Sequence, residues 1–343
     1  MKKITFAIVG FGHIGKRHAQ MIAAHPEAEL VGIADINESE RSNAAPLNVP
    51  YFDSMHDLLA AKIPVSVICI CTPNGLHAPL AIAALENGCH VVVEKPMGLT
   101  KASCEEVIFT SLKMSKQVFC VMQNRYSPPS QWLKQVIEEN RLGKIFTVQV
   151  NCYWNRDDRY YHPSVQGVPG SWKGTNALDG GPLFTQFSHF IDIMYWLFGD
   201  LSDIHAQFEN NNHRHSTEFI DDSGMVNFHF QNGGMGCFNY STAVWDKNLE
   251  SSITIIGEYG SIKVGGQYMD QVEYCHIKDY ILPEIAPVNP PNDYGAYKGS
   301  AANHHFVIQN VIDTLLGRST ITTNALEGMK VVEIIERIYA LRK

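Results

Sequence analysis

Two side chains in this 343-residue sequence are suited to moving a proton. Lys95 directly follows the apolar run Val91 to Val93, which predicts a buried strand. Open parallel sheets bind ligands outside the carboxyl ends of their strands, where an amine could take the proton of an alcohol. Alone, the Glu-Lys-Pro tripeptide at 94–96 better fits a solvated lysine beside a turn. His189 is the second candidate, on a helix that we expect over residues 183–198.

A glycine motif ahead of Lys95 predicts a dinucleotide site. Residues 4–9 form an apolar strand pattern, and GFGHIG follows at 10–15 at the head of a predicted helix. In this setting the glycines allow a tight turn, close approach of backbone to a pyrophosphate, and close helix packing. Asp35 ends a second predicted strand, 30–34, where an acidic side chain accepts hydrogen bonds from the adenosine ribose and repels a 2′-phosphate. Because Ile36 follows rather than arginine, we expect NAD rather than NADP.

Further strands should bring more residues to the same edge of the sheet. Strands are predicted over 65–71, 91–93 and 118–122, with helices over 77–87 and 103–115. His77 opens a helix, and an equally good interpretation has its ring bonded to nearby backbone. The residues expected to bind the cofactor are Gly10, Phe11, Gly12, His13, Ile14, Gly15, Asp35, Ile36, Thr72, Asn74, His77, Glu94, Lys95 and Gln123.

From Phe146 on, the pattern changes to period-two alternation, and the domain boundary is expected near Gln123. One such strand has Phe146, Val148, Val150, Cys152 and Trp154 on one face, and similar runs recur at 204–208, 226–230, 253–255 and 262–264. They predict a mostly antiparallel sheet with one buried face, and helices over 303–316 and 325–341 close the pattern. We therefore expect an α/β domain with a parallel sheet over 1–122 and an α+β domain over 123–343.

A Gly/Pro-rich loop over 162–176 precedes the helix of His189. Such long loops are usually functional or disordered. The cations Arg156, Arg159 and Lys173 could hold a carboxylate or phosphate there, although a solvated charged loop fits as well. On the helix, Thr185, His189 and Asp192 share one stripe, and from the residues alone a buried core histidine is the favoured interpretation.

Composition excludes several classes of protein. The net charge of −8 argues against a nucleic-acid or anionic-membrane partner. The eight cysteines form no CxxC pair, which suits a reducing cytoplasm. The apolar run 4–9 is too short for a signal peptide, and we find no membrane-spanning segment. We expect no metal site, because no acidic or thiol partner stands at ligand spacing to the pairs His213/His215 and His304/His305.

Taken in order, GFGHIG at 10–15, Asp35, CTPNGLH at 71–77 and EKP at 94–96 resemble the Gfo/Idh/MocA family, the relatives of glucose–fructose oxidoreductase and inositol dehydrogenase. The sequence QNRY at 123–126 and the pattern GG-x-L…H-x-x-D over 180–192 extend the resemblance over nearly the whole chain. It implies an NAD(P)-dependent dehydrogenase acting on a CH–OH group, with Lys95 and His189 as the catalytic pair. In relatives the open sheet face makes subunit contacts, which implies a homodimer or homotetramer.

Two details bear on the substrate. Thr185 stands where many relatives carry Asp, which leaves Lys95 and His189 without a third partner of that kind. SWKG at 171–174 resembles the UDP-N-acetylglucosaminuronate 3-dehydrogenase branch, from which the preceding loop departs in length. An inositol or free-sugar dehydrogenase, or a non-catalytic dinucleotide-binding regulator, are the alternatives. The residues expected to bind substrate are Arg125, Asn155, Arg156, Trp172, Lys173, Thr185 and His189.

Overall fold

The computed structural model describes residues 3–161, 172–293 and 298–342, which form two compact units. Unit 1 comprises Met1–Met122 and His304–Val332, and unit 2 comprises Gln123–Asn303 and Glu333–Lys343. The sequence places residues 304–332 in the second domain, but they pack with the first. Among the described residues, no helix has the length and apolar character that a membrane span needs.

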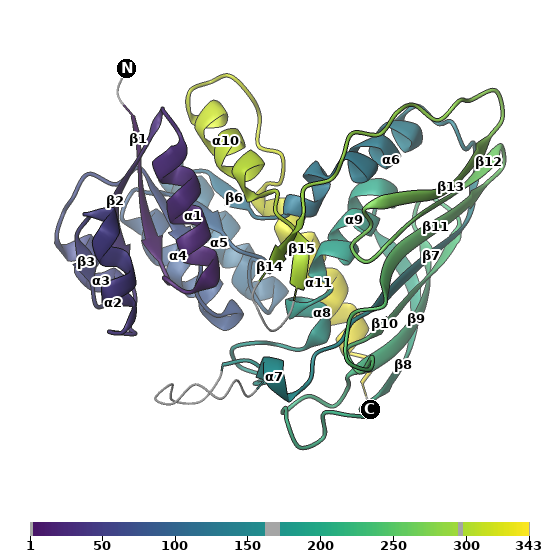
Figure 1. Cartoon of the computed structure of the whole chain (residues 1–343), viewed down its shortest axis with the longest axis horizontal. Coiled ribbons are helices and arrows are strands. Elements are labelled where there is room, and N and C mark those ends of the chain that lie inside the picture. The colour runs from purple at the N-terminus through teal and green to yellow at the C-terminus, as the bar shows by residue number, and fades with distance from the viewer. Residues whose placement is uncertain (1–2, 162–171, 294–297, 343) are drawn as a thin grey trace. The chain divides into compact units, whose positions relative to one another are not determined.

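Unit 1 is built on a parallel sheet, as predicted, which has six strands and includes the unpredicted β3 (Figure 1). Its strand order is β3-β2-β1-β4-β5-β6, so the topological switch point lies between β1 and β4. The central strands are apolar and buried on both faces, because helices cover the sheet on each side. The bounds are β1 Ile4–Val9, β2 Ala28–Ala34, β3 Tyr51–Phe52, β4 Val67–Ile70, β5 His90–Val93 and β6 Val118–Cys120.

Two helices of unit 1 begin at a side-chain cap. The Ser54 side chain accepts a hydrogen bond from Asp57 N–H at the start of one helix, and Thr100 accepts from Ser103 N–H at the start of another. The α-helices are α1 His13–Ala24, α2 Glu40–Ala44, α3 Met55–Ala60, α4 His77–Glu86, α5 Lys101–Met114 and α10 His304–Leu315, and α11 Ala325–Tyr339 contributes residues to both units. Short 3-10 turns occur at η1 Ala45–Leu47 and η2 Asn74–Leu76.

Unit 2 contains a seven-stranded sheet in the order β13-β12-β11-β7-β10-β9-β8. All neighbours are antiparallel except β7 and β10, which pair in parallel. The bounds are β7 Ile145–Tyr153, β8 Leu201–Glu209, β9 Ser223–Phe230, β10 Met235–Ser241, β11 Glu250–Gly257, β12 Gly260–Gly265 and β13 Gln271–Ile277. The mostly antiparallel sheet confirms the predicted fold class. Phe146 is an exception to the predicted buried face, because at the start of β7 its side chain is 46% exposed.

Helix α9, Ser188–Phe198, covers one face of this sheet. Helix α9 packs on it through Phe190, whose ring meets Trp154 edge to face. The predicted continuous helix 183–198 is wrong, because it is interrupted after Thr185: the backbone of Phe187 (φ −110°, ψ 1°) leaves the helical region while its ring packs on Trp154. Outside this sheet, unit 2 also contains η3 Gln123–Tyr126, α6 Pro128–Glu138, α7 Asp158–Tyr161, α8 Pro182–Thr185, and the two-stranded β14 Pro291–Asp293 and β15 Lys298–Ala301.

Candidate functional site

The glycine turn of unit 1 has two packed glycines and one open glycine. A Cβ on Gly10 (φ +90°) would lie 2.6 Å from the carbonyl oxygen of Cys71, and one on Gly15 would lie 2.0 Å from the carbonyl oxygen of Gly10. A Cβ on Gly12 would meet no atom within 4 Å. Gly12 is also the N-cap of α1, with no side-chain cap, so backbone N–H groups of the first turn face an open space. This cradle fits a pyrophosphate.

Asp35 ends β2 beside this turn. Its carboxylate accepts hydrogen bonds from the backbone N–H of Phe11 and from that of Asn37, the latter at 2.7 Å. The side chain is half-exposed, and the neighbouring Ile36 is exposed, so the carboxylate can still accept a ribose hydroxyl. Thr72, at the end of β4, has a buried hydroxyl oxygen without a hydrogen-bond partner in the described part of the chain. Both features fit a bound dinucleotide.

The other predicted cofactor residues differ in exposure. Phe11 and Asn74 are buried, Ile14 is half-buried, and His13 is exposed beside the open glycine. Gln123 belongs to unit 2, where its buried side-chain oxygen has no hydrogen-bond partner among the described residues.

His77 links two strand ends. Its Nδ1 lies 2.6 Å from the carbonyl oxygen of Pro96, and its Nε2 lies 2.8 Å from that of Thr72. Burial lowers the pKa of His77 despite these two acceptors. The backbone-bonded interpretation of His77 therefore describes the structure, and its contact with a cofactor stays a prediction.

Glu94 lies in a buried cluster next to Lys95. Its Oε1 accepts a hydrogen bond from Nε2 of His18 at 2.9 Å and lies 3.6 Å from Nε2 of His304. Burial would raise the pKa of Glu94, but the hydrogen bond from His18 and the nearby His304 and Lys95 outweigh it and lower the pKa to about 2. The pair His304/His305 did not predict this cluster, because His18 and Glu94 lie far from it in the sequence. The three side chains are potential metal ligands, and the absence of a metal site stays a prediction.

Lys95 itself follows β5, two positions along the sheet from β1 and its glycine turn. Its side chain is half-buried. The strand-end position predicted for this amine is therefore the one it occupies in unit 1.

In unit 2, Arg125 forms a buried ion pair. Its Nε donates to Oδ2 of Asp192 at 2.8 Å and its Nη2 donates to Oδ1 at 2.7 Å. Neither side chain is more than 1% exposed. The pair joins η3 to α9, so Arg125 has a structural role that does not favour the predicted contact with substrate.

Thr185 has a carboxylate neighbour that sequence reasoning missed. Its hydroxyl donates to Oδ1 of Asp179, whose Oδ2 accepts the backbone N–H of Gly174 at 2.8 Å. Asp179 is completely buried. Its place directly before Gly180–Gly181 was the available signal. His189 is buried at the start of α9, four positions after Thr185.

Arg156 and Lys173 lie on the same aromatic ring. The Arg156 guanidinium carbon is 5.3 Å and the Lys173 Nζ is 4.0 Å from the centre of Tyr160. Burial, followed by the charge of Arg156, lowers the pKa of Lys173 to about 8, against an opposing effect of Asp179. Residues 162–171 of the predicted loop lie outside the described residues.

Two further predicted substrate residues flank this pair of cations. The Asn155 side chain is half-buried and donates from Nδ2 to the carbonyl oxygen of Val244 at 2.7 Å. Trp172 is also half-buried. Unit 2 thus gathers Asn155, Arg156, Trp172 and Lys173 on neighbouring segments.

Comparison with known proteins decides the family. The description "Oxidoreductase family, NAD-binding Rossmann fold" matches residues 4–122, and the C-terminal domain of the same family matches residues 130–263. The chain belongs to the Gfo/Idh/MocA family. Its first unit is therefore an NAD-binding Rossmann domain, in agreement with the predicted cofactor.

Members of the Gfo/Idh/MocA family with known structures or activities resemble the chain to different extents. The WlbA dehydrogenase of Bordetella pertussis, crystallised with NADH and UDP-GlcNAcA, is 30% identical with a TM-score of 0.87, covering 99% of this chain and 96% of its own. D-glucoside 3-dehydrogenase of Escherichia coli K12 is 28% identical over 57% of this chain, and inositol 2-dehydrogenase of Salmonella typhimurium LT2 is 30% identical over 56%. The chain spans about half the length of these two curated relatives, 54% in each case.

Proposed function

We propose that this protein is an NAD-dependent dehydrogenase that oxidises a secondary alcohol of a sugar or nucleotide sugar. The favoured substrate is a UDP-N-acetylhexosaminuronate, oxidised at C3. The observation that carries the proposal is the match over 99% of the chain to the Bordetella pertussis dehydrogenase crystallised with NADH and UDP-GlcNAcA. The strand-end position of Lys95 in unit 1 supports the same chemistry.

Each part of the chain has a role in this reaction. The turn at 10–15, Asp35 and Thr72 hold the dinucleotide, which when bound supplies the hydride acceptor. The amine of Lys95 removes the hydroxyl proton or hydrogen-bonds the resulting alkoxide, and His189 shares that proton. Arg156 and Lys173 hold an anionic group of the substrate.

Replacing Lys95 tests the catalytic assignment. In Lys95→Met, turnover of UDP-GlcNAcA should fall by about 10²- to 10⁴-fold, because positioned proton transfer contributes that much. Affinity for NAD, measured by calorimetry, should change little. Lys101→Met is the matched control, because this lysine lies six residues further on with 42% of its side chain exposed. Near-wild-type turnover in Lys95→Met would remove the lysine from the mechanism.

A substrate panel separates the proposed substrate from its alternatives. The absorbance of reduced nicotinamide should increase faster with UDP-GlcNAcA than with UDP-GlcNAc, free sugars or inositols. The inositol alternative draws support from the 30% identical inositol 2-dehydrogenase. A regulator would bind NAD and oxidise none of them, but such a protein would be expected to have lost Lys95 or His189, and this chain keeps both.

We also infer a cytoplasmic homo-oligomer, EC class 1.1.1. All eight cysteines are free thiols, five of them buried, which suits a reducing compartment. One face of the seven-stranded sheet exposes Met225 and Met235, which supports a subunit contact there.

A further inference from the structure

The loop 210–222, between β8 and β9, is bonded to both segments that carry the predicted cations. Ser216 Oγ donates to Asp158 Oδ1 at 2.7 Å, close to Arg156 in the chain. The backbone N–H of Glu218 donates to the carbonyl oxygen of Gly174 at 2.8 Å, next to Lys173. The loop therefore connects the two segments on which an anion would depend.

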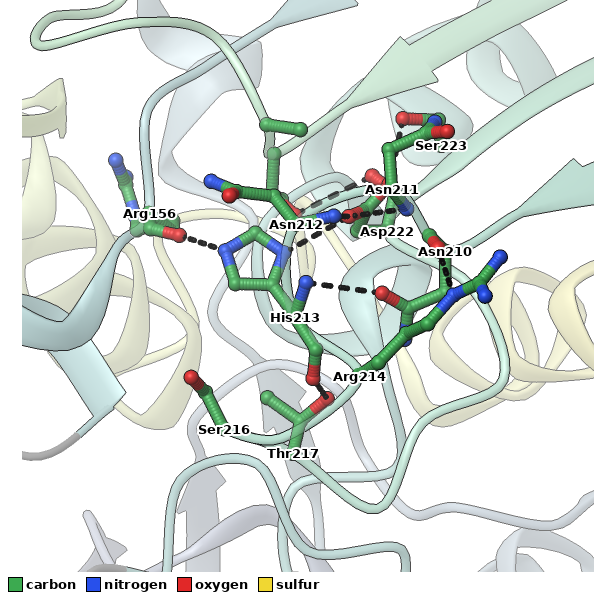
Figure 2. Close-up of polar contacts among 12 residues, drawn as sticks. Arg156, Asn210, Asn211, Asn212, His213, Arg214, Ser216, Thr217, Asp222 and Ser223 are labelled. Atoms are coloured by element: carbon green, nitrogen blue, oxygen red, sulfur yellow. Dashed lines mark hydrogen bonds and ion pairs between the residues drawn. The ribbon is translucent and has the colours of Figure 1, made fainter.

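His213 lies at the centre of this loop and is buried (Figure 2). Its Nε2 contacts the carbonyl oxygen of Arg156, and its Nδ1 lies 3.1 Å from Oδ2 of Asp222. The ring of His213 therefore contacts the Arg156 backbone on one side and the Asp222 carboxylate on the other.

Asp222 is arranged to stay ionised. Its Oδ2 also accepts the backbone N–H groups of Asn211 at 2.9 Å and Asn212 at 2.7 Å, and its Oδ1 accepts the hydroxyl of Ser223 at 2.8 Å (Figure 2). Burial would raise the pKa of Asp222, but the hydrogen bonds from His213, Asn212 and Ser223 lower it overall. A fixed carboxylate thus holds the ring of His213 in place.

The other charged or titratable groups around the ring do not replace this pairing. Tyr161 packs edge to face on His213 with ring centres 5.2 Å apart, and burial raises the pKa of its phenol, so it stays neutral. Arg214 turns its Nε to the carbonyl oxygen of Asn210, at 2.7 Å.

The contact with His213 fixes Arg156 from the carbonyl side. On the other side, the backbone N–H of Arg156 donates to the carbonyl oxygen of Thr242 at 2.9 Å. The guanidinium lies over the ring of Trp154, 4.7 Å from its centre, and donates from Nη1 to Asn248 Oδ1 at 3.1 Å. The backbone of this arginine is therefore held through both its N–H and its carbonyl group.

We propose that His213, paired with Asp222, is a positioning residue that fixes Arg156 for binding an anionic group of the substrate. The group is a diphosphate or a carboxylate, which share the same recognition chemistry. This inference rests on the proposed function, because it assigns Arg156 to the substrate. It gives His213 a role that involves no metal.

Binding measured without turnover tests the inference. We compare His213→Gln with His215→Gln, a control two residues away whose side chain is exposed. Calorimetry in the presence of NADH should give His213→Gln a Kd for UDP-GlcNAcA raised by about tenfold to 100-fold, the size expected for a misplaced charge-assisted contact. The Kd for NADH and the kcat at saturating substrate should change less than twofold. UDP and UDP-GlcNAc distinguish the sources: if both weaken equally with UDP-GlcNAcA the anion is the diphosphate, and if only UDP-GlcNAcA weakens it is the carboxylate.

The outcomes separate this inference from the proposed function. Unchanged binding in His213→Gln, or an equal loss of NADH and UDP-GlcNAcA binding, would overturn the positioning role, as would a wild-type chain that binds none of the three nucleotides. A wild-type chain that binds UDP-GlcNAcA but does not oxidise it would reject only the proposed reaction. If His213→Gln does not fold, Asp222→Asn takes its place because Asp222 holds the same ring: a raised Kd for UDP-GlcNAcA supports the proposal and an unchanged Kd overturns it.

Discussion

Lys173 carries its charge in a place that solvent reaches poorly. Burial and the guanidinium of Arg156 disfavour the ammonium, so its pKa falls to about 8. An anion bound beside the two cations would favour the ammonium again. A lysine in this setting is therefore charged at neutral pH but close to losing its proton.

This pKa predicts a pH dependence of substrate binding. Below about pH 8 Lys173 is a cation and holds an anion, and above it the neutral amine does not, so the KM for UDP-GlcNAcA should rise as pH increases, approaching tenfold per unit. Lys173→Met should show a raised KM that no longer changes in this range, in steady-state assays from pH 6.5 to 9.5. Lys247→Met, an exposed lysine of the same unit, should keep the wild-type profile. An unchanged profile in Lys173→Met would contradict the assignment.

At the residue scale, the sequence predicted where the candidate residues lie better than it predicted which side chains they contact. Lys95 lies at the strand end where its neighbours placed it, and Asp35 ends β2. The pairing of Arg125 with Asp192 could not be predicted, because it joins residues that only the folded chain brings together. The contact of Thr185 with Asp179 joins residues only six apart, and the place of Asp179 before Gly180–Gly181 was the signal that was missed.

In the turn between β1 and α1, one glycine is needed for packing and another leaves space for a ligand. Gly15 is pressed against backbone, whereas Gly12 faces open space. A methyl group on Gly15 must displace main chain, whereas a methyl group on Gly12 meets no atom of the protein. The two glycines therefore have different reasons to lack a side chain.

Alanine at each glycine should give opposite results. Gly12→Ala should keep the wild-type urea midpoint but lose NAD affinity by at least about tenfold, equivalent to about 1.4 kcal/mol, because its methyl group occupies the space for the pyrophosphate. Gly15→Ala should lower the urea midpoint. Urea titration and calorimetry measure both quantities. Normal NAD affinity in Gly12→Ala would place the pyrophosphate elsewhere.

The buried pair between η3 and α9 makes a second prediction at this scale. Asp192→Ala should reduce the free energy of unfolding by about 3–5 kcal/mol, because it leaves the Arg125 guanidinium buried without its carboxylate. The double variant Arg125→Met/Asp192→Leu should lose less than the single variant, since no charge remains to be buried. Urea denaturation compares them. Equal losses in both would show that packing, rather than charge, dominates at this site.

Elements were predictable where their pattern was continuous. The apolar run of β1 gave its bounds, 4–9, directly. Strand β10 was missed although it alternates, because Gly236 interrupts the pattern: a Cβ there would lie 2.4 Å from the ring of Phe228, so only glycine leaves room. Strand β13 was missed because polar residues such as Gln271 and Glu273 occupy much of it.

At the scale of the whole molecule, the sheet of unit 2 presents apolar side chains on its second face. Met225 is 62% and Met235 is 56% exposed, on neighbouring strands and opposite to the buried Val226 and Phe238. Exposed apolar groups on a broad sheet mark a contact surface. The proposed homo-oligomer would bury them.

Charge on this face should therefore separate the subunits. The variant Met225→Glu/Met235→Glu should elute with the mass of one chain in size-exclusion chromatography with light scattering, because a carboxylate is costly to bury in a contact. Ile281→Glu is the control, an apolar residue that is even more exposed, at 91%, on another segment of unit 2. A wild-type chain that is already monomeric, or a double variant with unchanged mass, would contradict the assembly.

Residues 304–332 belong to unit 1 but are synthesised only after residues 123–303 of unit 2. The β6 backbone receives a partner from them, since Cys120 N–H donates to the carbonyl oxygen of Thr323 at 3.0 Å and Phe119 forms a bridge with Asn324. A ribosome makes β6 first and then the whole of 123–303 before this partner exists. The nascent nucleotide-binding unit must wait through that interval with an unpaired strand edge, a state in which chaperones are expected to hold it.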